Sequence, residues 1–394
     1  MSDMKLKDKT LSANTGLDAI KRAPIVEYDT GLKCIRIQDI SQGKNYDEWG
    51  FTETNEKDRK KFLLKKNDLL IARTGATVGV SQFIKEDTEA VYNNGTIRLR
   101  LEKSLNPRFV YYIFQTKGFL QYIDNISCVA TQPNLRIEGL LRFTIPDYSI
   151  EKQNAIVKTL STFDDLIENN NKRIKLLKQM AENLYKEWFV RFRFPGYEDV
   201  EFEEKKPRSW QVGTEDKKHF APTIFRYDEF GTIGSFVRGK NITAAQMIEE
   251  NIPVISAGLQ PSGYHNEANV FGENLTISAS GANAGYLQYN LNDIWAADCS
   301  YYQDNATIWF VYNTLKYLQP VISNLQCGAA QPHVYPKNIN SLCILIPTEE
   351  LIHKYNDFVK PYYDEIKVLN QHNQLLTQQR DMLLPRLMSG KLEV

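Results

Sequence analysis

The chain has 394 residues, which is too long for one ordinary domain and fits two to four folded units. Hydrophobic residues make up 42% and charged residues 24%, a composition typical of a globular protein with a core in each unit. Lysine plus arginine and aspartate plus glutamate are both 48, so the formal net charge is zero. This balance argues mildly against a nucleic-acid binder, but a basic face can be offset by acidic residues elsewhere.

The five cysteines are at positions 34, 128, 299, 327 and 343, and no two of them form a Cys-x-x-Cys pair. An odd number at this spacing indicates neither a disulfide framework nor a zinc knuckle, and it fits a reducing compartment. Residues 1–10 are charged rather than apolar, so we expect no signal peptide, and no run of about 18 apolar residues exists to span a membrane. We therefore expect a cytoplasmic protein without a membrane partner.

In chain order, the pattern predicts a mixed module, a long helix, a linker, a second mixed module and a second long helix. In the first module we expect strands at 32–40, 69–73, 78–84 and 96–101 and a helix at 107–121. A long helix follows at 150–192, and Pro195 and Gly196 with a charge run then indicate a linker. In the second module we expect strands at 252–256, 275–279 and 306–310 and a helix at 313–325, before a long helix at 349–387.

Four matched features show that the sequence contains an internal repeat, with an offset of roughly 200 residues between the two copies. A short apolar run precedes Gly-Ala-x-x-Gly at Gly75–Gly79 and again at Gly281–Gly285. A Gln-Pro pair follows at Gln132 and at Gln331, then Ile-Pro, then a long helix. One such turn would be weak evidence, but four features in one order are hard to obtain by chance.

The two long helices carry apolar residues alternately three and four positions apart, which is a heptad seam. Each seam contains a polar residue, Asn170 or Asn373, that either fixes the register or is tolerated at a wet edge. Pro361 suggests a helix start slightly after 349, and Pro385 suggests the end of that helix. The residues on which we base the seam are Leu160, Ile167, Asn170, Ile174, Leu177, Leu184, Ile366, Leu369, Asn373, Leu376 and Leu383.

These elements predict an α+β fold with two tandem α/β modules, each followed by a long helix. We expect the helices to pack as an antiparallel coiled coil, each about 60 Å long, so that the two modules are related by a pseudo-two-fold axis. The domains expected are a first module at 1–148, a central helical spacer at 149–194, a linker at 195–208, a second module at 209–347 and a C-terminal helical spacer at 348–394.

The segment Leu-Tyr-Lys-Glu-Trp-Phe-Val-Arg-Phe-Arg-Phe-Pro-Gly at 184–196 resembles the specificity subunits of type I restriction–modification systems. The Gln-Pro and Ile-Pro motifs, Gly-Ser-Phe-Val-Arg-Gly-Lys-Asn at 234–241 and Leu-Pro-Arg-Leu-Met-Ser-Gly-Lys-Leu at 384–392 carry the same resemblance. At the front of the first module, Thr15–Leu17 is the candidate counterpart of the segment at 234–241.

The resemblance implies two target recognition domains that read a bipartite double-stranded DNA target, with a spacer set by the helices. It also implies DNA methyltransferase subunits, usually two, and a restriction subunit that translocates DNA as partners. The chain itself would then have no catalytic residues, no metal and no cofactor. Two half-sites related by a two-fold axis would suit two modules held in inverted orientation.

Side chains near the repeated turns are the candidate DNA contacts. We expect contacts to phosphates or bases from Lys60, Lys61, Arg73, Thr74, Gly75, Lys240, Ser280, Gly281, Asn283 and His333. The glycines either form plain turns or let the backbone approach a partner closely. For the basic cluster that contains Lys60 and Lys61, a solvated loop is the default interpretation and phosphate contact is the alternative. Because Gln132 and Gln331 recur where the two modules should read different bases, we favour a structural role for them at the module–helix junction.

Two other classes of function remain open at this point: a stand-alone methyltransferase or nuclease, and a coiled-coil adaptor that binds proteins. The enzyme would need a cofactor or metal motif, and the sequence contains no adjacent prolines, no Gly-x-Gly loop after a strand and no His-x-x-x-His spacing. The segment Gly234–Lys240 nearly matches a phosphate-binding loop, but Asn241 stands where a Mg²⁺-ligating hydroxyl is required.

Overall fold

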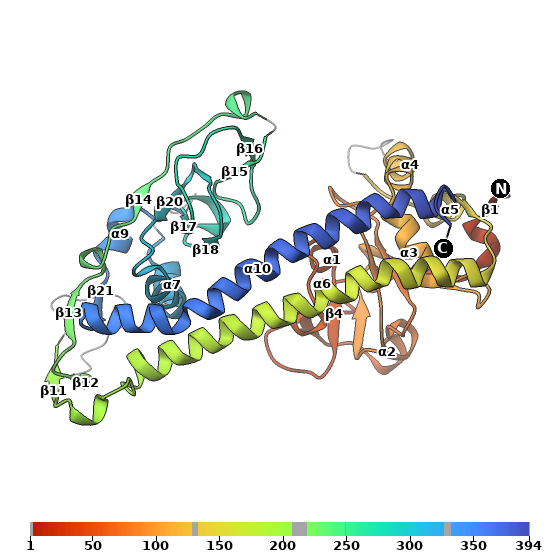
Figure 1. The fold of residues 1–394 in the computed structure, drawn as a ribbon. Coiled ribbons are helices and arrows are strands. Elements are labelled where there is room, and N and C mark those ends of the chain that lie inside the picture. The colour runs from red at the N-terminus through yellow and green to blue at the C-terminus, as the bar shows by residue number, and fades with distance from the viewer. Residues whose placement is uncertain (1–2, 128–132, 207–218, 249, 327–331, 394) are drawn as a thin grey trace. The chain divides into compact units, whose positions relative to one another are not determined.

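The structure is a computed structural model that describes residues 3–127, 133–206, 219–248, 250–326 and 332–393. The chain divides into two compact units, one of residues 1–168 and 373–394 and the other of residues 169–372. Both boundaries fall inside long helices, α6 (Ile150–Tyr185) and α10 (Glu349–Met388), which are the two long helical ribbons in Figure 1. Within the described ranges, no helical segment combines the length and apolarity that a bilayer crossing requires.

The first unit is built on an antiparallel sheet of strand order β2-β9-β6-β7. A second sheet, β3-β5-β4-β8, contains the parallel pair β4–β8, and β1 pairs with β10. The strands are β1 (Asp3–Lys5), β2 (Thr10–Thr15), β3 (Ile25–Val26), β4 (Lys33–Ile35), β5 (Gly50–Thr52), β6 (Leu69–Ala72), β7 (Ser81–Phe83), β8 (Ala90–Tyr92), β9 (Thr96–Leu101) and β10 (Thr144–Pro146). The helices are α1 (Ile37–Ser41), α2 (Glu56–Phe62), α3 (Pro107–Phe114), α4 (Lys117–Ser127) and α5 (Ile137–Leu141).

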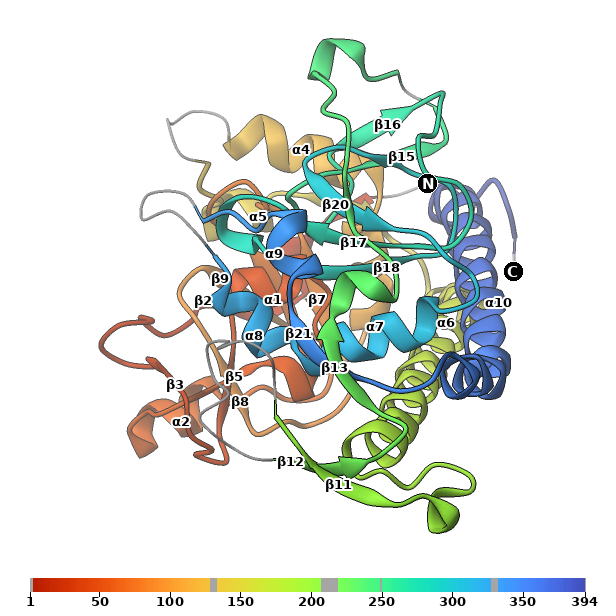
Figure 2. The same ribbon diagram turned by 90° about the vertical axis from the view of Figure 1, so that its left-hand side faces the viewer.

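The second unit repeats this plan with the sheets β14-β20-β17-β18 and β16-β15-β19, and β15–β19 is again a parallel pair. Figure 2 shows β13 beside β21, the pair that corresponds to β1–β10. The strands are β11 (Phe202–Lys205), β12 (His219–Pro222), β13 (Arg226–Glu229), β14 (Val237–Arg238), β15 (Ile252–Ile255), β16 (Gly263–His265), β17 (Asn274–Ser278), β18 (Leu287–Asn290), β19 (Trp295–Ala296), β20 (Cys299–Tyr302) and β21 (Cys343–Ile346). The helices are α7 (Ile308–Tyr317), α8 (Gln319–Asn324) and α9 (Pro336–Asn340).

The repeat in the sequence is therefore a repeat of a folded module. We call β1 to β10 copy one and β13 to β21 copy two. Each copy is closed by pairing its first strand with its last, immediately before its long helix. The expected α+β fold with two tandem modules, each followed by a long helix, is confirmed.

Several element boundaries differ from those expected. The strand expected at 32–40 ends at Ile35, because the Arg36 N–H donates to the Asp39 carboxylate over 2.9 Å and opens helix α1. The strand expected at 306–310 is wrong: the run from Ile308 to Val311 is the buried start of α7, and the strand at this point of the fold is β20. A short run that is buried on all sides has no periodicity that distinguishes helix from strand.

The helix expected at 107–121 and the helix expected at 313–325 are each replaced in the structure by two shorter helices. In copy one Thr116 separates α3 from α4, and its hydroxyl accepts the Phe119 N–H over 3.3 Å while donating to the Ile113 carbonyl. In copy two the break is at Leu318, and Pro320 in the first turn of α8 has no N–H to donate to the preceding turn. Strand 96–101, in contrast, is confirmed with both ends as expected.

The long helices pack antiparallel within each unit, as expected. In the first unit Arg380 donates to the Asp164 carboxylate over 2.8 Å, and Leu160 packs in one core with Leu384 and Leu387. In the second unit Tyr355 donates to the Ala181 carbonyl over 2.9 Å. The expected seam residues are all buried or half-buried, and Asn170 is 8% exposed.

Both proline expectations for the second long helix are wrong. Helix α10 begins at Glu349 and continues through Pro361, and Pro385 lies inside its last turns rather than at its end. The linker expected at 195–208 also contains structure, since β11 pairs with β12. The first long helix ends in a π-helical turn at Lys186–Val190, close to the expected end at 192.

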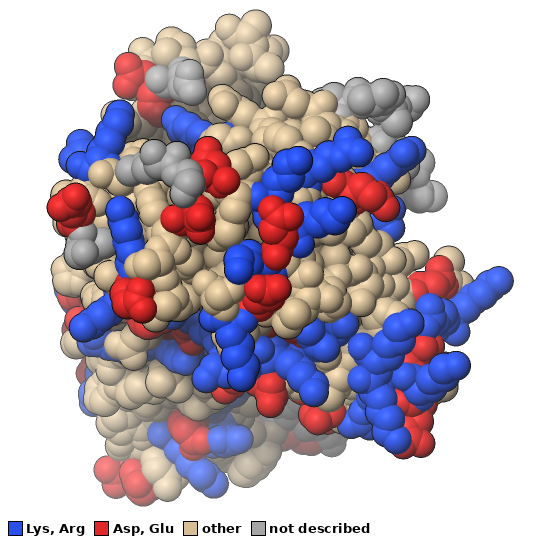
Figure 3. Space-filling model, turned by 90° about the vertical axis from the view of Figure 1, so that its right-hand side faces the viewer, with Lys and Arg blue, Asp and Glu red and all other residues tan. Residues whose placement is uncertain are grey.

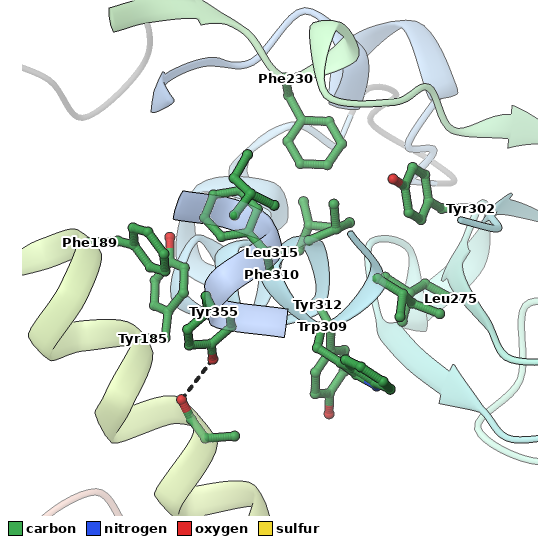
Figure 4. Close-up of a cluster of buried hydrophobic side chains, with 14 of the residues drawn as sticks. Tyr185, Phe189, Phe230, Leu275, Tyr302, Trp309, Phe310, Tyr312, Leu315 and Tyr355 are labelled. Atoms are coloured by element: carbon green, nitrogen blue, oxygen red, sulfur yellow. Dashed lines mark hydrogen bonds between the residues drawn. The ribbon is translucent and has the colours of Figure 1, made fainter. Parts of the chain in front are cut away.

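The core of the second unit joins copy two to both helix segments. Tyr185 and Phe189 point toward Phe310 of α7 and Tyr355 of α10, as Figure 4 shows. The Phe189 and Phe310 ring centroids are 4.9 Å apart in an edge-to-face arrangement. Burying a large side chain contributes about 1.5–3 kcal/mol, so this cluster fixes the module firmly on its own helical segments.

Candidate nucleic-acid interface

The Gly-Ala-x-x-Gly turn and the Gln-Pro-x loop of copy one meet at the end of β6. Leu135 donates its N–H to the Arg73 carbonyl over 2.7 Å, and Gly75 donates to the Pro133 carbonyl over 3.3 Å. Thr74 and Asn134 form an antiparallel bridge between these two contacts. Two motifs that are about 60 residues apart thus form one structure, which we call the junction.

Copy two builds the same junction from different side chains. Val334 donates to the Ala279 carbonyl over 3.0 Å, and Gly281 donates to the Pro332 carbonyl over 3.1 Å. Ser280 and His333 form the antiparallel bridge. The positions of Asn134 and His333 are therefore equivalent in the two copies. Gln132 and Gln331 lie outside the described residues.

The second glycine of each turn is required for two reasons. Gly79 and Gly285 have φ values of +92° and +86°, which L side chains rarely adopt. A Cβ at Gly79 would lie 3.1 Å from a methyl group of Ile123 in α4, and one at Gly285 would lie 3.2 Å from the same atom of Ile322 in α8. These glycines let the turn pack on the second short helix.

The side chains that surround the two junctions differ in chemistry. In copy one the Arg73 Nη2 donates to Asn134 Oδ1 over 3.0 Å. In copy two the arginine position is Ala279, and the His333 ring stacks on Tyr335 with centroids 5.9 Å apart. Both Asn134 and Tyr335 are exposed. The backbone frame is shared, and the groups that it presents are not.

Sequence reasoning missed an ion-paired group at the junction of copy two. Ser280 donates its hydroxyl to the Asp298 carboxylate, which also pairs with Arg238. Asp298 precedes β20, the strand that pairs with β17, so it reaches the junction through sheet pairing. No local pattern marks it. Asn283 donates to the Ala257 carbonyl over 3.4 Å, within its own module.

Thr15–Leu17 and Arg238–Lys240 occupy equivalent places. Leu17 and Lys240 donate their N–H groups to the carbonyls of Tyr92 and Ala296, over 2.9 Å in each case. A Cβ on Gly16 would lie 2.2 Å from the Tyr92 carbonyl oxygen, and one on Gly239 would lie 2.5 Å from that of Ala297. Because they have no Cβ, both glycines let their own segment pass close to the backbone of a neighbouring segment.

This geometry excludes a phosphate-binding loop at Gly234–Lys240. Such a loop connects a strand to the start of a helix, whereas here Val237 and Arg238 form strand β14. The Lys240 Nζ lies 5.8 Å from the centre of the Trp295 ring, and the Trp295 Nε1 donates to the Lys240 carbonyl over 2.8 Å. Lys240 therefore belongs to a stacked surface group and not to either junction.

Lys60 and Lys61 lie on helix α2, away from the junction contacts. Lys60 pairs with Glu56 over 2.6 Å, and the Lys61 Nζ lies 5.4 Å from the centre of the Phe62 ring. On the face shown in Figure 3, lysine and arginine side chains are numerous, and acidic side chains lie among them. Four members of the basic cluster, Lys57, Arg59, Lys60 and Lys61, therefore lie on a helix, whereas Lys65 and Lys66 lie in the non-helical segment that follows it.

The repeated module is also a repeated match to one family model. Residues 26–179 and residues 224–378 each match the type I restriction modification DNA specificity domain. The chain belongs to this family. As a member of the DNA specificity domain family, it is a subunit that determines DNA sequence specificity, and the matches do not favour the adaptor or the stand-alone enzyme.

Relatives extend the match over nearly the whole chain. The type I restriction enzyme MjaIX specificity subunit of Methanocaldococcus jannaschii is 27% identical over 90% of this chain and 83% of its own length. The putative MjaX specificity subunit of the same organism is 24% identical over 99% of this chain and 93% of its own length. The crystal structure of the S subunit of a type I restriction-modification system from M. genitalium shares the fold, with a TM-score of 0.54 and 20% identity over 98% of this chain and 96% of that one.

Proposed function

We propose that each copy reads one half of a bipartite double-stranded DNA target, and that the chain has no catalytic centre of its own. The observation that carries this proposal is the junction, which is built twice on the same backbone frame with different side chains. A shared frame with unlike exposed groups suits two modules that bind one kind of ligand and distinguish different sequences of it.

The relatives' names support partners of a defined kind. Because they are specificity subunits of type I restriction enzymes, we propose that this chain joins DNA methyltransferase subunits, two per chain, and a restriction subunit that translocates DNA. Two modules with one topology offer two similar attachment points, which supports the pair of methyltransferase subunits.

Residue roles follow from the chemistry of the junctions. In copy one Arg73, Thr74 and Asn134 are proposed base contacts, since arginine pairs bidentately with guanine and asparagine with adenine. The Arg73 Nε is enclosed and has no hydrogen-bond partner among the described residues, and an unpaired buried donor is costly. A contact with DNA that reorients this side chain would relieve that cost.

In copy two the proposed base contacts are Ser280, Asn283 and His333, with Tyr335 as a stacking neighbour of the histidine. Gly75 and Gly281 have no Cβ, and a Cβ there would meet nothing within 4 Å, so the backbone at both turns is open to close approach. Lys60, Lys61 and Lys240 are proposed phosphate contacts.

Selection from a pool of random duplexes tests the function. The chain assembled with its methyltransferase partner should enrich two short defined sequences separated by a fixed, undefined spacer. Titration of the isolated chain with S-adenosylmethionine is the matched control, and no binding is expected. Enrichment of no motif by the assembled complex would favour the protein adaptor, and tight cofactor binding by the isolated chain would favour the stand-alone methyltransferase.

A further inference from the structure

The two copies differ in length between β5 and β6 in copy one and the equivalent strands β16 and β17 in copy two. Thr52 and His265 occupy equivalent positions. Each comes directly after a residue that pairs with β4 in copy one or with β15 in copy two, and these are the strands that also form the parallel pair of their copy. Leu64 and Val270 are also equivalent. Their N–H groups donate to the carbonyls of Ala90 and Ile294, and these two acceptors occupy matching positions in the two copies. Between these landmarks copy one has residues 53–63 and copy two only residues 266–269. The additional residues of copy one form helix α2.

The added segment is basic, and its counterpart is not. Residues 53–63 contain four basic and three acidic residues, a net charge of +1, whereas residues 266–269 contain no basic residue and one glutamate. The contrast extends to the modules as wholes. Residues 1–148 contain 23 basic and 19 acidic residues, and residues 209–347 contain 7 basic and 11 acidic residues. The neutral total therefore hides two modules of opposite net charge.

Helix α2 presents its lysines on one face. Lys57, Lys60 and Lys61 are at positions i, i+3 and i+4, which share a helix face, and all three are exposed. The opposite face is anchored by Asp58, which is 7% exposed, and by the buried Phe62. Helix α2 is thus fixed on the module with its cations directed outward.

Two further contacts fix the orientation of α2. Asn55 caps the helix by accepting the Asp58 N–H over 2.9 Å, and Arg22 pairs with the Asp58 carboxylate over 2.5 Å. The Arg22 hydrogen bond lowers the pKa of Asp58, so this anchor stays ionised at neutral pH. A hollow of 580 Å³ beside the helix is lined by Lys21, Arg22, Arg59 and Glu53, and its two arginines are paired with Asp58 and Glu89.

We propose that α2 is a phosphate-binding element present in copy one alone, so that the two half-sites are held by different physical interactions. Copy one neutralises DNA phosphates through the lysine face of α2, and its binding weakens with salt as counterions are released. Copy two binds mainly through uncharged and aromatic groups. This inference rests on the proposed function and adds to it which half of the target carries the electrostatic attraction.

The surface of copy two agrees with this division. Phe271, which lies just after the loop equivalent to α2, is 60% accessible, and the junction of copy two exposes Tyr335. Copy two has few cations, and Lys316 is paired with Glu182 and Arg238 with Asp298. Lys60 and Arg59 of α2 are also paired, with Glu56 and Glu89, so the copies differ in the number of their cations and not in pairing. Contacts from such a surface release few counterions, so they should depend little on salt.

The test measures the salt dependence of DNA affinity for the complex assembled with its methyltransferase partner, on the duplex that the selection yields. The triple variant Lys57→Gln, Lys60→Gln and Lys61→Gln should reduce the slope of log affinity against log salt by about 0.9 for each phosphate that is no longer neutralised, up to about 2.7. Its selected motif should be unchanged. Lys158→Gln, Lys175→Gln and Lys354→Gln remove the same charge from exposed positions on the long helices and should leave the slope as it was.

Duplexes with neutral methylphosphonate linkages around one half-site or the other assign the interaction to its copy. Neutral linkages around the half-site of copy one should weaken binding by the wild type, and the triple variant should show little additional weakening. Neutral linkages around the other half-site should affect the two proteins equally.

A motif selected normally by a triple variant with an unchanged slope would overturn this inference and leave the proposed function intact. Impaired partner assembly with an unchanged slope would also overturn it and would assign α2 to a protein interface. Failure of the wild type to select any motif would instead overturn the proposed function.

Discussion

Arg73 donates a hydrogen bond to the Asn134 side chain over 3.0 Å, and this pair joins the turn after β6 to the loop before α5. The equivalent positions in copy two are Ala279 and His333, on the same backbone frame. The fold therefore holds two unlike pairs of side chains in matching places. This relationship separates the residues that build the junction from those that give each copy its own specificity.

Exchanging the side chain at one junction should change one half-site only. For Asn134→His we expect altered bases in the half-site read by copy one, and a loss of about 1–3 kcal/mol in binding free energy for the original sequence. The reciprocal change His333→Asn should alter the other half-site. Motif selection with each assembled variant provides the measurement. Parallel changes in both half-sites from either substitution would refute the assignment.

The paired glycines should differ in their effect on stability. Gly75 has a φ of +82° but open space around it, so Gly75→Ala should lower the free energy of unfolding by about 1 kcal/mol through backbone strain. Gly79→Ala adds the close approach to Ile123 and should cost about 2–3 kcal/mol. Urea unfolding measures both. Equal effects would show that packing on α4 does not matter, and Gly79→Ala combined with Ile123→Val should recover part of the stability.

The antiparallel helices give a prediction about the spacer. One heptad inserted in α6 between Ile167 and Leu184, together with one in α10 between Asn356 and Asn373, lengthens both segments by about 10 Å. The selected spacer should then grow by about three base pairs while both half-sites remain unchanged. An insertion in α6 alone is the control, since it misaligns ion pairs such as Arg173–Glu365 and should impair assembly. An unchanged spacer in the double insertion would show that helix length does not set it.

Buried thiols make the protein less stable in alkali. Burial raises the pKa of Cys34 and of Cys299 to about 12, against 9.0 for an ordinary thiol. Between these values the unfolded chain releases protons that the folded chain retains, so the free energy of unfolding falls as pH rises. Each thiol should contribute about 1.4 kcal/mol per pH unit, and the full contribution is present below pH 9.

Unfolding measured between pH 8 and pH 11 checks this slope. Cys299→Ala should make it shallower, and so should Cys34→Ala, because each removes one buried thiol. A slope that is the same in all three proteins would contradict the account of the buried thiols.

The sequence was sufficient to predict the repeat, the long helices and the turn glycines, because periodicity and matched motifs are local. It did not predict that the turn at Gly75 and the loop at Asn134 meet, since backbone hydrogen bonds between distant segments leave no side-chain pattern. The equivalence of Gly16 and Gly239 was only a candidate for the same reason: the contacts are to main-chain carbonyls, and the flanking residues differ. Asp298 reaches its junction through strand pairing, which composition does not encode. The start of α7 was mistaken for a strand because burial on all sides removes the periodicity on which that choice depends.

Motif selection by a chain that carries one module twice tests the central claim most directly. Because each module is closed by pairing its first and last strands, residues 226–346 can be replaced by residues 3–146 at the matching pairs β13–β21 and β1–β10. If each copy reads one half-site, the assembled variant should select an inverted repeat of the copy-one half-site, with a fixed spacer and without the copy-two sequence. Selection of the original asymmetric motif, or of a motif containing neither half-site, would contradict the account.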